Sequence, residues 1–134
     1  MRSACRNALL AGLVSLIAFP AGAAKTTLVV KFKSGESSSA VSGSVQGYDI
    51  TTYLLAAKKG QTMSIRFEPD NESCAFNLIA PGASSAMFNG SIDGMEFAGS
   101  LPADGTYSAM AYLMRNAARR GDTCTFKLTF EVSG

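Results

Sequence analysis

The chain has 134 residues, of which 47% are hydrophobic, 12 are basic, 10 are acidic and none is histidine. This length fits one domain, and the lack of histidine removes the commonest general base and the commonest metal ligand in proteins. The formal net charge of +2 is too small to indicate nucleic-acid binding.

The first 23 residues have the features of a secretory signal peptide. Arg2 and Arg6 give a positive start, residues 8–19 are apolar, and the small residues of the stretch 21–23 fit a signal-peptidase site. The apolar run is too short to span a bilayer. We therefore predict residues 1–23 as a signal peptide and residues 24–134 as an exported, periplasmic domain that does not insert into the membrane.

The predicted cleavage sets both the start and the charge of the mature domain. Cleavage is expected after Ala23 or after Ala24. Removing Arg2 and Arg6 leaves ten basic residues against ten acidic residues, so the mature domain is formally neutral and we expect no nucleic-acid partner.

The mature domain keeps two of the three cysteines, because Cys5 belongs to the signal peptide. Cys74 and Cys124 both fall on the apolar side of alternating segments. In an oxidising compartment such a pair is expected to form a structural disulfide. The alternative is two buried free thiols that act as small apolar residues.

Most of the mature chain alternates between apolar and polar residues, with Gly, Pro, Asn and Asp between the alternating segments. These segments are 26–33, 40–47, 48–57, 62–68, 73–80, 86–92, 95–101, 106–115 and 122–132. Period-two alternation with turn residues at short intervals predicts an all-β fold. We predict a single antiparallel β-sandwich or jelly roll of about eight strands.

A short connection in the second half of the mature chain, YLMRNAARRGD, contains three arginines: Arg115, Arg119 and Arg120. Residues 116–120 are the one predicted helical turn, with Asn116 as its cap and Gly121 as its stop. Two guanidinium groups four residues apart then project from one face and suit carboxylates or phosphates. The alternative is that Arg119 and Arg120 bind the last carbonyl groups of the turn.

Two other loops contain candidate contact residues. Tyr48 follows a glycine at the start of a strand, and Tyr107 follows the tight turn LPADG, which includes Asp104. For Tyr107 the alternative is a tyrosine buried at a strand corner, with its hydroxyl bonded to the backbone. The chain has no phosphate-binding loop, nucleophile elbow or calcium loop, so we predict no enzyme activity, no metal and no cofactor.

Three stretches in this order, GYDITTYLLAAKKGQ, LPADGTY and YLMRNAARRG, resemble the bacterial periplasmic inhibitors of goose-type (g-type) and invertebrate-type (i-type) lysozymes. The likeness covers residues 25–132. The same stretches also resemble periplasmic domains of the pre-peptidase β-sandwich kind, which carry no proven inhibitor activity.

The resemblance implies a function and a binding site. Such inhibitors insert loops into the lysozyme cleft and occupy the region of its catalytic carboxylates. On this resemblance Arg115 and Arg119 are the cleft-directed anchors and Tyr48 is a contact beside them. The remaining candidates for lysozyme binding are Asp104, Tyr107 and Arg120.

One position departs from the family pattern. The family turn often reads Ser-Gly-x-Tyr, with the serine reaching catalytic groups, but this chain has Asp104 at the matching position. A carboxylate facing carboxylates is repelled, so the departure favours a g-type target over an i-type target. The alternative function is a periplasmic β-sandwich module that binds glycan or an envelope protein without inhibiting lysozyme.

Overall fold

The computed structural model describes residues 22–134, so most of the predicted signal peptide lies outside the described residues. Within this range the elements are β1 (Lys25–Val29), β2 (Ser38–Gln46), β3 (Ile50–Ala57), β4 (Thr62–Pro69), β5 (Cys74–Ile79), β6 (Phe88–Asn89), α1 (Gly90–Asp93), β7 (Glu96–Ser100), β8 (Gly105–Leu113), α2 (Arg115–Arg119) and β9 (Thr123–Ser133). The all-β prediction is confirmed.

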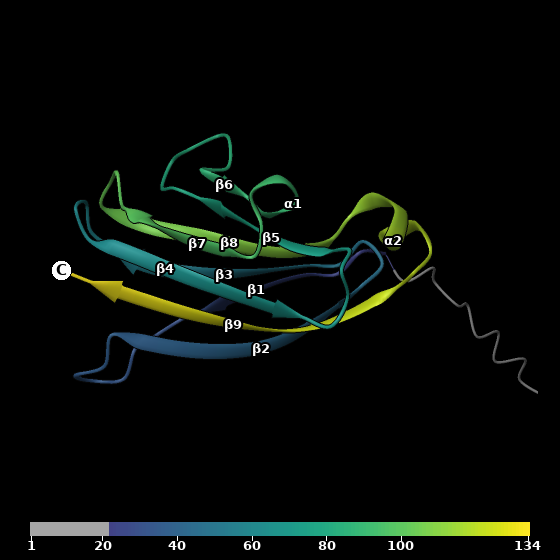
Figure 1. The fold of residues 1–134 in the computed structure, drawn as a ribbon, viewed down its shortest axis with the longest axis horizontal. Helices are drawn as coiled ribbons and strands as arrows, with labels where there is room; N and C mark the ends of the chain where they lie inside the picture. The colour runs from purple at the N-terminus through teal and green to yellow at the C-terminus, as the bar shows by residue number, and fades with distance from the viewer. Residues whose placement is uncertain (1–21) are drawn as a thin grey trace, which may run out of the picture.

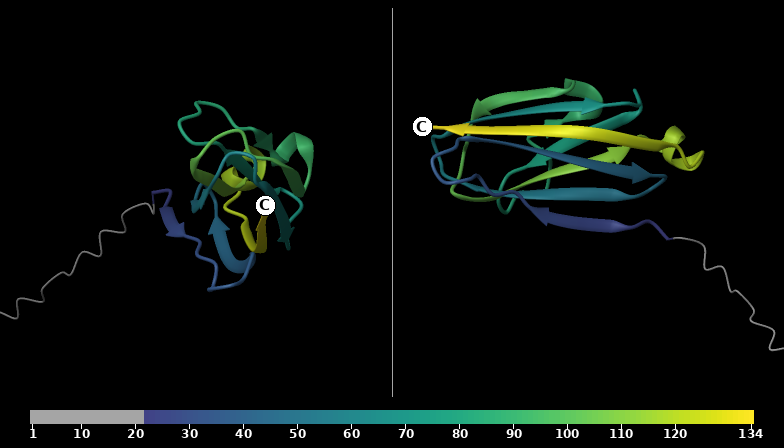
Figure 2. Two further views of the ribbon diagram at one scale, coloured as in Figure 1. Left: turned by 90° about the vertical axis from the view of Figure 1, so that its left-hand side faces the viewer. Right: turned by 90° about the horizontal axis from the view of Figure 1, so that it is seen from below.

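The strands form two sheets that pack face to face (Figure 1; Figure 2). Sheet A has the order β1-β3-β8-β5-β6, and sheet B has the order β2-β9-β4-β7. The prediction of antiparallel pairing holds for all described pairs except β1 with β3, which run parallel with Lys25 opposite Ile50. The chain visits sheet B as β2 before it returns as β3, and this detour gives β1 and β3 the same direction.

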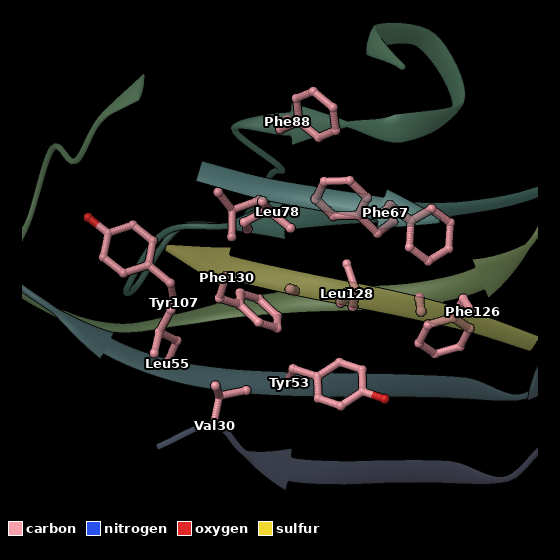
Figure 3. Close-up of a cluster of buried hydrophobic side chains, with 14 of the residues drawn as sticks. Val30, Tyr53, Leu55, Phe67, Leu78, Phe88, Tyr107, Phe126, Leu128 and Phe130 are labelled. Atoms are coloured by element: carbon pink, nitrogen blue, oxygen red, sulfur yellow. The ribbon is translucent and has the colours of Figure 1, made fainter. Parts of the chain in front are cut away.

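The core fills the space between the two sheets (Figure 3). The largest fully buried side chains are Tyr53, Tyr107, Phe76, Phe130, Met63, Ile65, Leu78, Leu128 and Val45, with the two cysteines. Phe67 of sheet B lies 5.5 Å from Phe76 of sheet A between ring centroids, so aromatic contacts join the layers. Each such side chain contributes about 1.5–3 kcal/mol by burial, which makes this interface the main source of stability.

A disulfide joins the two sheets near α2. Cys74 begins β5 in sheet A, Cys124 lies near the start of β9 in sheet B, and their Cα atoms are 6.3 Å apart. The predicted disulfide is confirmed, and the alternative of two free thiols is wrong.

The segment predicted as a strand over 86–92 is mostly not a strand. Only Phe88 and Asn89 pair in β6, and the chain then turns into α1. The side chain of Asn89 accepts a hydrogen bond from the Ser91 amide, and the carboxylate of Asp93 accepts one of 2.9 Å from the Asn89 amide. Gly90 lies so close to the backbone of Phe76 that a side chain there would clash. These local bonds and this close contact favour a turn over a longer strand.

The predicted helical turn exists but begins one residue earlier than expected. Met114 is at the N-cap position and makes no side-chain cap bond, so the prediction that Asn116 caps the helix is wrong. Gly121 has φ +72° and its amide donates to Ala118 O at 3.0 Å. The prediction that Gly121 ends the turn is confirmed, since this conformation favours glycine.

Removing the disulfide should weaken the fold substantially. In the double variant Cys74→Ala/Cys124→Ala we expect the free energy of unfolding to fall by about 4 kcal/mol, because the bridge closes a loop between residues 50 apart in sequence. Urea unfolding of the oxidised protein and of the variant measures the difference. Chemically reduced wild-type protein is the control and should unfold at lower urea than the oxidised form. Coincident curves for all three would contradict the prediction.

The hydroxyl of Tyr53 should be dispensable. It is buried against Gly43 and has no hydrogen-bond partner among the described residues. We expect Tyr53→Phe to raise the free energy of unfolding by about 1 kcal/mol, since an unsatisfied buried hydroxyl is costly. The matched control is Tyr107→Phe, which should be destabilising because that hydroxyl donates to Ala103 O at 2.7 Å.

The variant Tyr53→Phe should also change how stability depends on pH. Burial raises the pKa of Tyr53 above its ordinary value of 10.0. The unfolded chain therefore ionises first, and the stability present below pH 10 is lost as the pH rises towards the folded pKa. Urea midpoints from pH 7 to pH 11 should fall less steeply for Tyr53→Phe than for the wild type. Parallel curves would show that this hydroxyl does not titrate on unfolding.

Candidate functional site

The three arginines of the sequence motif lie at one end of the sandwich. Arg115 and Arg119 are in α2, Arg120 follows it, and all three are exposed. This end, where α2 joins β8 to β9, is called here the α2 end (Figure 1). The short helix therefore carries its charged side chains into solvent at the tip of a rigid β scaffold.

Buried alanines and backbone hydrogen bonds fix α2 to the scaffold. Ala117 and Ala118 are 0% and 3% exposed and pack on the core. The Met114 amide donates to Ser73 O at 2.7 Å before the helix, and the Asp122 amide donates to Ala117 O at 3.0 Å after it. The position of α2 is thus set by groups other than the arginine side chains.

The arginines differ in their partners. Arg120 forms an ion pair with Asp122, with 2.9 Å between Nη2 and Oδ2. Within residues 22–134 neither Arg115 nor Arg119 forms an ion pair or a side-chain hydrogen bond, and backbone amides bind the last carbonyl groups of α2. The alternative in which Arg119 and Arg120 bind those carbonyls is therefore wrong.

The charges of Arg115 and Arg119 give the helix little net stabilisation. Like charges four residues apart repel each other, and Arg115 in the first turn opposes the helix dipole, whereas Arg119 in the last turn is favourable to it. Both guanidinium groups are instead available to an external acidic group. Their spacing of four residues on one turn places them on a common face.

The turn that carries Tyr48 packs directly beside α2. The Gly47 amide donates to Asp122 O at 2.9 Å, and a Cβ at Gly47 would lie 3.6 Å from Ala118 O. Gly47 has φ +60°, as the first central residue of a type II′ turn does. The Tyr48 side chain is 57% exposed. The structure therefore brings Tyr48 to the arginine end, as the sequence interpretation required.

Asp104 and Tyr107 do not join this group. Asp104 lies in the turn before β8, whereas α2 follows the end of β8, so the nine-residue strand separates Asp104 from α2 by about 27 Å. Tyr107 is the third residue of the same strand, nearer to its Asp104 end. Asp104 Oδ1 accepts a hydrogen bond of 2.7 Å from the Lys59 amide. The prediction of one site that includes Tyr48, Asp104 and Arg115 is wrong, because a strand carries the chain from one end of the sandwich to the other.

Tyr107 has a structural position. It is 0% exposed, and its hydroxyl accepts from the Ala103 amide at 3.1 Å and donates to the Ala103 carbonyl at 2.7 Å. The strand-corner alternative for Tyr107 is confirmed. A side chain without exposed surface is not available for direct contact with another protein.

The sequence interpretation missed Asp49, which organises the turn next to the arginines. Its Oδ2 accepts from the Gln46 amide at 3.2 Å, and its Oδ1 accepts from the Ala24 amide at 2.8 Å. A hollow of about 320 Å³ beside this turn is lined by Ala23, Gln46, Gly47, Tyr48 and Asp49. The signal available in the sequence was the position of this aspartate directly after Tyr48, a candidate contact residue.

Neither a metal site nor a membrane helix is found in residues 22–134. This part of the chain has no group of three or more metal-binding side chains, and none of its helices is long and apolar enough to cross a membrane. The arrangement at the α2 end is a projecting contact surface with two free guanidinium groups and an exposed tyrosine. Its chemistry suits the binding of an acidic protein surface.

The chain has a curated relative over nearly its whole length. The Escherichia coli protein named inhibitor of g-type lysozyme is 30% identical over 136 residues, which cover 98% of each chain. No protein-family model matches the chain.

Solved structures agree with this relationship. Aeromonas hydrophila PliG, a periplasmic lysozyme inhibitor of g-type lysozyme, is 37% identical with a TM-score of 0.75, covering 82% of this chain and 98% of that chain. A mutant of PliG from E. coli is 30% identical with a TM-score of 0.65, covering 83% and 100%. The pre-peptidase C-terminal domain of a Bacillus anthracis collagenase, at 12% identity and a TM-score of 0.52, shares the fold.

The comparisons agree with the resemblance drawn from the three sequence stretches, and these relatives are inhibitors rather than enzymes. Identity of 30% over 98% of both chains is sufficient to assign the family. The chain belongs to the family of periplasmic inhibitors of g-type lysozyme.

Proposed function

We propose that this protein is exported to the periplasm, where it inhibits g-type lysozyme by placing the α2 end in the active-site cleft. The observation that carries the proposal is the pair of exposed arginines, Arg115 and Arg119, which have no acidic partner among the described residues. Tyr48 lies on the adjoining turn and supplies an exposed aromatic contact. Arg120 is a weaker contributor, because Asp122 already occupies its guanidinium group.

A glycosidase cleft is a suitable receptor for these groups. It holds a carboxylic acid with a raised pKa and further acidic groups that bind sugar. A guanidinium entering such a cleft forms charge-assisted hydrogen bonds and displaces water from the site of hydrolysis. An aromatic side chain beside it adds buried area at low entropic cost, as is common in binding hot spots.

The rigid anchoring of α2 supports the same proposal. Ala117 and Ala118 are buried, and the disulfide joins β9, the strand that follows the helix, to β5 of the other sheet, so little ordering remains to be done on binding. Preorganisation of this kind raises affinity by lowering the entropic cost of association. The alternative function, a binding module without inhibitor activity, has in its favour only the shared fold of the collagenase domain.

Loss of the two free arginines should abolish most of the inhibition. For Arg115→Ala/Arg119→Ala we expect the inhibition constant against g-type lysozyme to rise about 100-fold or more, since two hot-spot contacts are removed. The assay is residual lysis of cell-wall substrate by g-type, i-type and c-type lysozymes against increasing inhibitor. Selective inhibition of the g-type enzyme by the wild type is expected.

The matched control is Lys58→Ala/Lys59→Ala, which removes two exposed cations, as many as the arginine variant, from the opposite end of the sandwich. It should inhibit like the wild type, and it separates the effect of position from the effect of net charge. Raising the salt concentration should weaken the wild type more than the arginine variant. If the arginine variant inhibits as well as the wild type, the proposed contact surface is incorrect.

The family departure at Asp104 should be silent for g-type inhibition. Because Asp104 lies at the far end of β8 from α2, Asp104→Ser is expected to change the inhibition constant less than twofold. Its hydrogen bond to the Lys59 amide can be kept by a serine hydroxyl, so only a small change in melting temperature is expected. A large loss or gain of g-type inhibition would place the lysozyme contact at the Asp104 end instead.

A further inference from the structure

We propose that cleavage of the signal peptide after Ala23 completes the inhibitory site, because the α-ammonium group that it creates on Ala24 forms an ion pair with Asp49. This inference rests on the proposed function. The carrying observation is the distance of 2.8 Å between the Ala24 nitrogen and Asp49 Oδ1. Nothing in the inhibitory role by itself requires the chain to begin at this residue.

The covalent step is hydrolysis of one peptide bond by a signal peptidase. Water attacks the Ala23 carbonyl carbon, the bond between that carbon and the Ala24 nitrogen breaks, Ala23 leaves as a carboxylate that keeps the water oxygen, and the Ala24 nitrogen takes up both protons of the water to become an ammonium group. A backbone amide that donated one hydrogen bond to the Asp49 carboxylate becomes an ammonium group with three donors. The bond was already charge-assisted on the acceptor side, and the new positive charge adds the attraction between two opposite charges.

The position of the cut follows from the bonds of Ala24. Its nitrogen donates to Asp49, and its carbonyl accepts from the Ile50 amide at 2.9 Å. Cleavage after Ala24 would remove both bonds, whereas cleavage after Ala23 keeps both and adds a charge. Of the two sites that the sequence allows, the structure therefore favours the first.

Asp49 connects the new terminus to the contact surface. One carboxylate oxygen holds Ala24, and the other holds the Gln46 amide, so Asp49 spans the turn that presents Tyr48. The Asp49 amide also donates to Gln46 O at 3.0 Å. An ion pair at one oxygen fixes the carboxylate and with it the turn between residues 46 and 49.

The strand that follows the new terminus needs such an anchor. All five residues of β1 are exposed, including Leu28 and Val29, and within residues 22–134 β3 is the one strand that pairs with it. An exposed edge strand held on one side frays easily unless its end is tied down. The pair between Ala24 and Asp49 provides that tie at the start of β1.

The uncut chain also lies beside the contact surface. Ala23 lines the hollow of about 320 Å³ next to Tyr48, and it does so together with Asp49. Cleavage after Ala23 removes this residue from the hollow. Maturation therefore both clears the space beside Tyr48 and fixes the turn that carries it.

The test compares three purified proteins that begin at Ala24, at Ala23 or at Lys25, each also made with Asp49→Asn. Relative to the Ala24 protein, the Ala23 protein keeps the Ala24 amide but moves the charge, and the Lys25 protein loses both bonds of Ala24. We expect the Ala24 protein to melt about 2–5 °C above the Ala23 protein. Its inhibition constant against g-type lysozyme should be about 3- to 10-fold lower.

Asp49→Asn completes a double-mutant cycle, since asparagine keeps an acceptor oxygen but no charge. In this background the Ala24 and Ala23 proteins should have melting temperatures that differ by less than about 1 °C. A difference that persists with asparagine, or equal melting temperatures with aspartate, would overturn the ion pair. Should Asp49→Asn not fold, exchange of the Ile50 amide in the Ala24 and Ala23 proteins decides the point, with slower exchange expected for the former.

Two further measurements test the parts of the proposal separately. Mass spectrometry of exported protein should find Ala24 at the N-terminus, and a start at Lys25 would overturn the assigned cleavage site. The melting temperatures are measured without lysozyme. If none of the proteins inhibits g-type lysozyme, the proposed function fails while the ion pair is still decided by melting.

Discussion

Closure of the two sheets at the α2 end is the constraint on which the rest of this structure depends. Cys74 and Cys124 tie the start of β5 to the start of β9, and the buried alanines of α2 pack over the same end of the core. The connection between β8 and β9 thereby becomes a fixed feature instead of a mobile loop. Every exposed side chain at this end takes its position from that closure, because loops on a rigid scaffold carry their side chains in defined places.

Stability and binding are separate tasks at this end. Backbone amides satisfy the last carbonyls of α2, and alanines supply the burial, so Arg115 and Arg119 contribute nothing that the fold requires. Their mutual repulsion is a small cost, of about 0.2–0.5 kcal/mol for a pair four residues apart. In the proposed function an acidic partner offsets this cost when it binds the pair.

The sequence predicted the architecture well because burial on one face leaves a period of two along a strand. Cys74 and Cys124 could be paired from their common apolar phase and the export signal alone. Where the prediction failed, contacts distant in sequence decided the outcome. Gly90 turns the chain at the backbone of Phe76, and β1 is parallel to β3 because β2 lies in the other sheet. Neither contact leaves a local pattern.

The prediction that Asp104 shares a site with Arg115 failed for a reason of topology. Residues that flank a single strand lie at opposite ends of a sandwich, so Asp104 before β8 and Arg115 after it are not able to share a site. The same rule places Tyr48 correctly, because β3 starts at the end where β8 finishes. The number of strands between two residues therefore separates the two groups from the sequence alone.

Asp49 shows why supporting residues are harder to find than contact residues. Three arginines in one short connection stand out in a sequence by their residue type. Asp49 does not, because aspartate is common in turns. Its role depends on Ala24, which is 25 positions away and lies next to a predicted cleavage site. The Asp49 carboxylate accepts hydrogen bonds from amides of both the turn and the start of the edge strand, so it holds the two together as one unit. The geometry of the Tyr48 turn is therefore a property of where the mature chain begins as well as of the turn sequence itself.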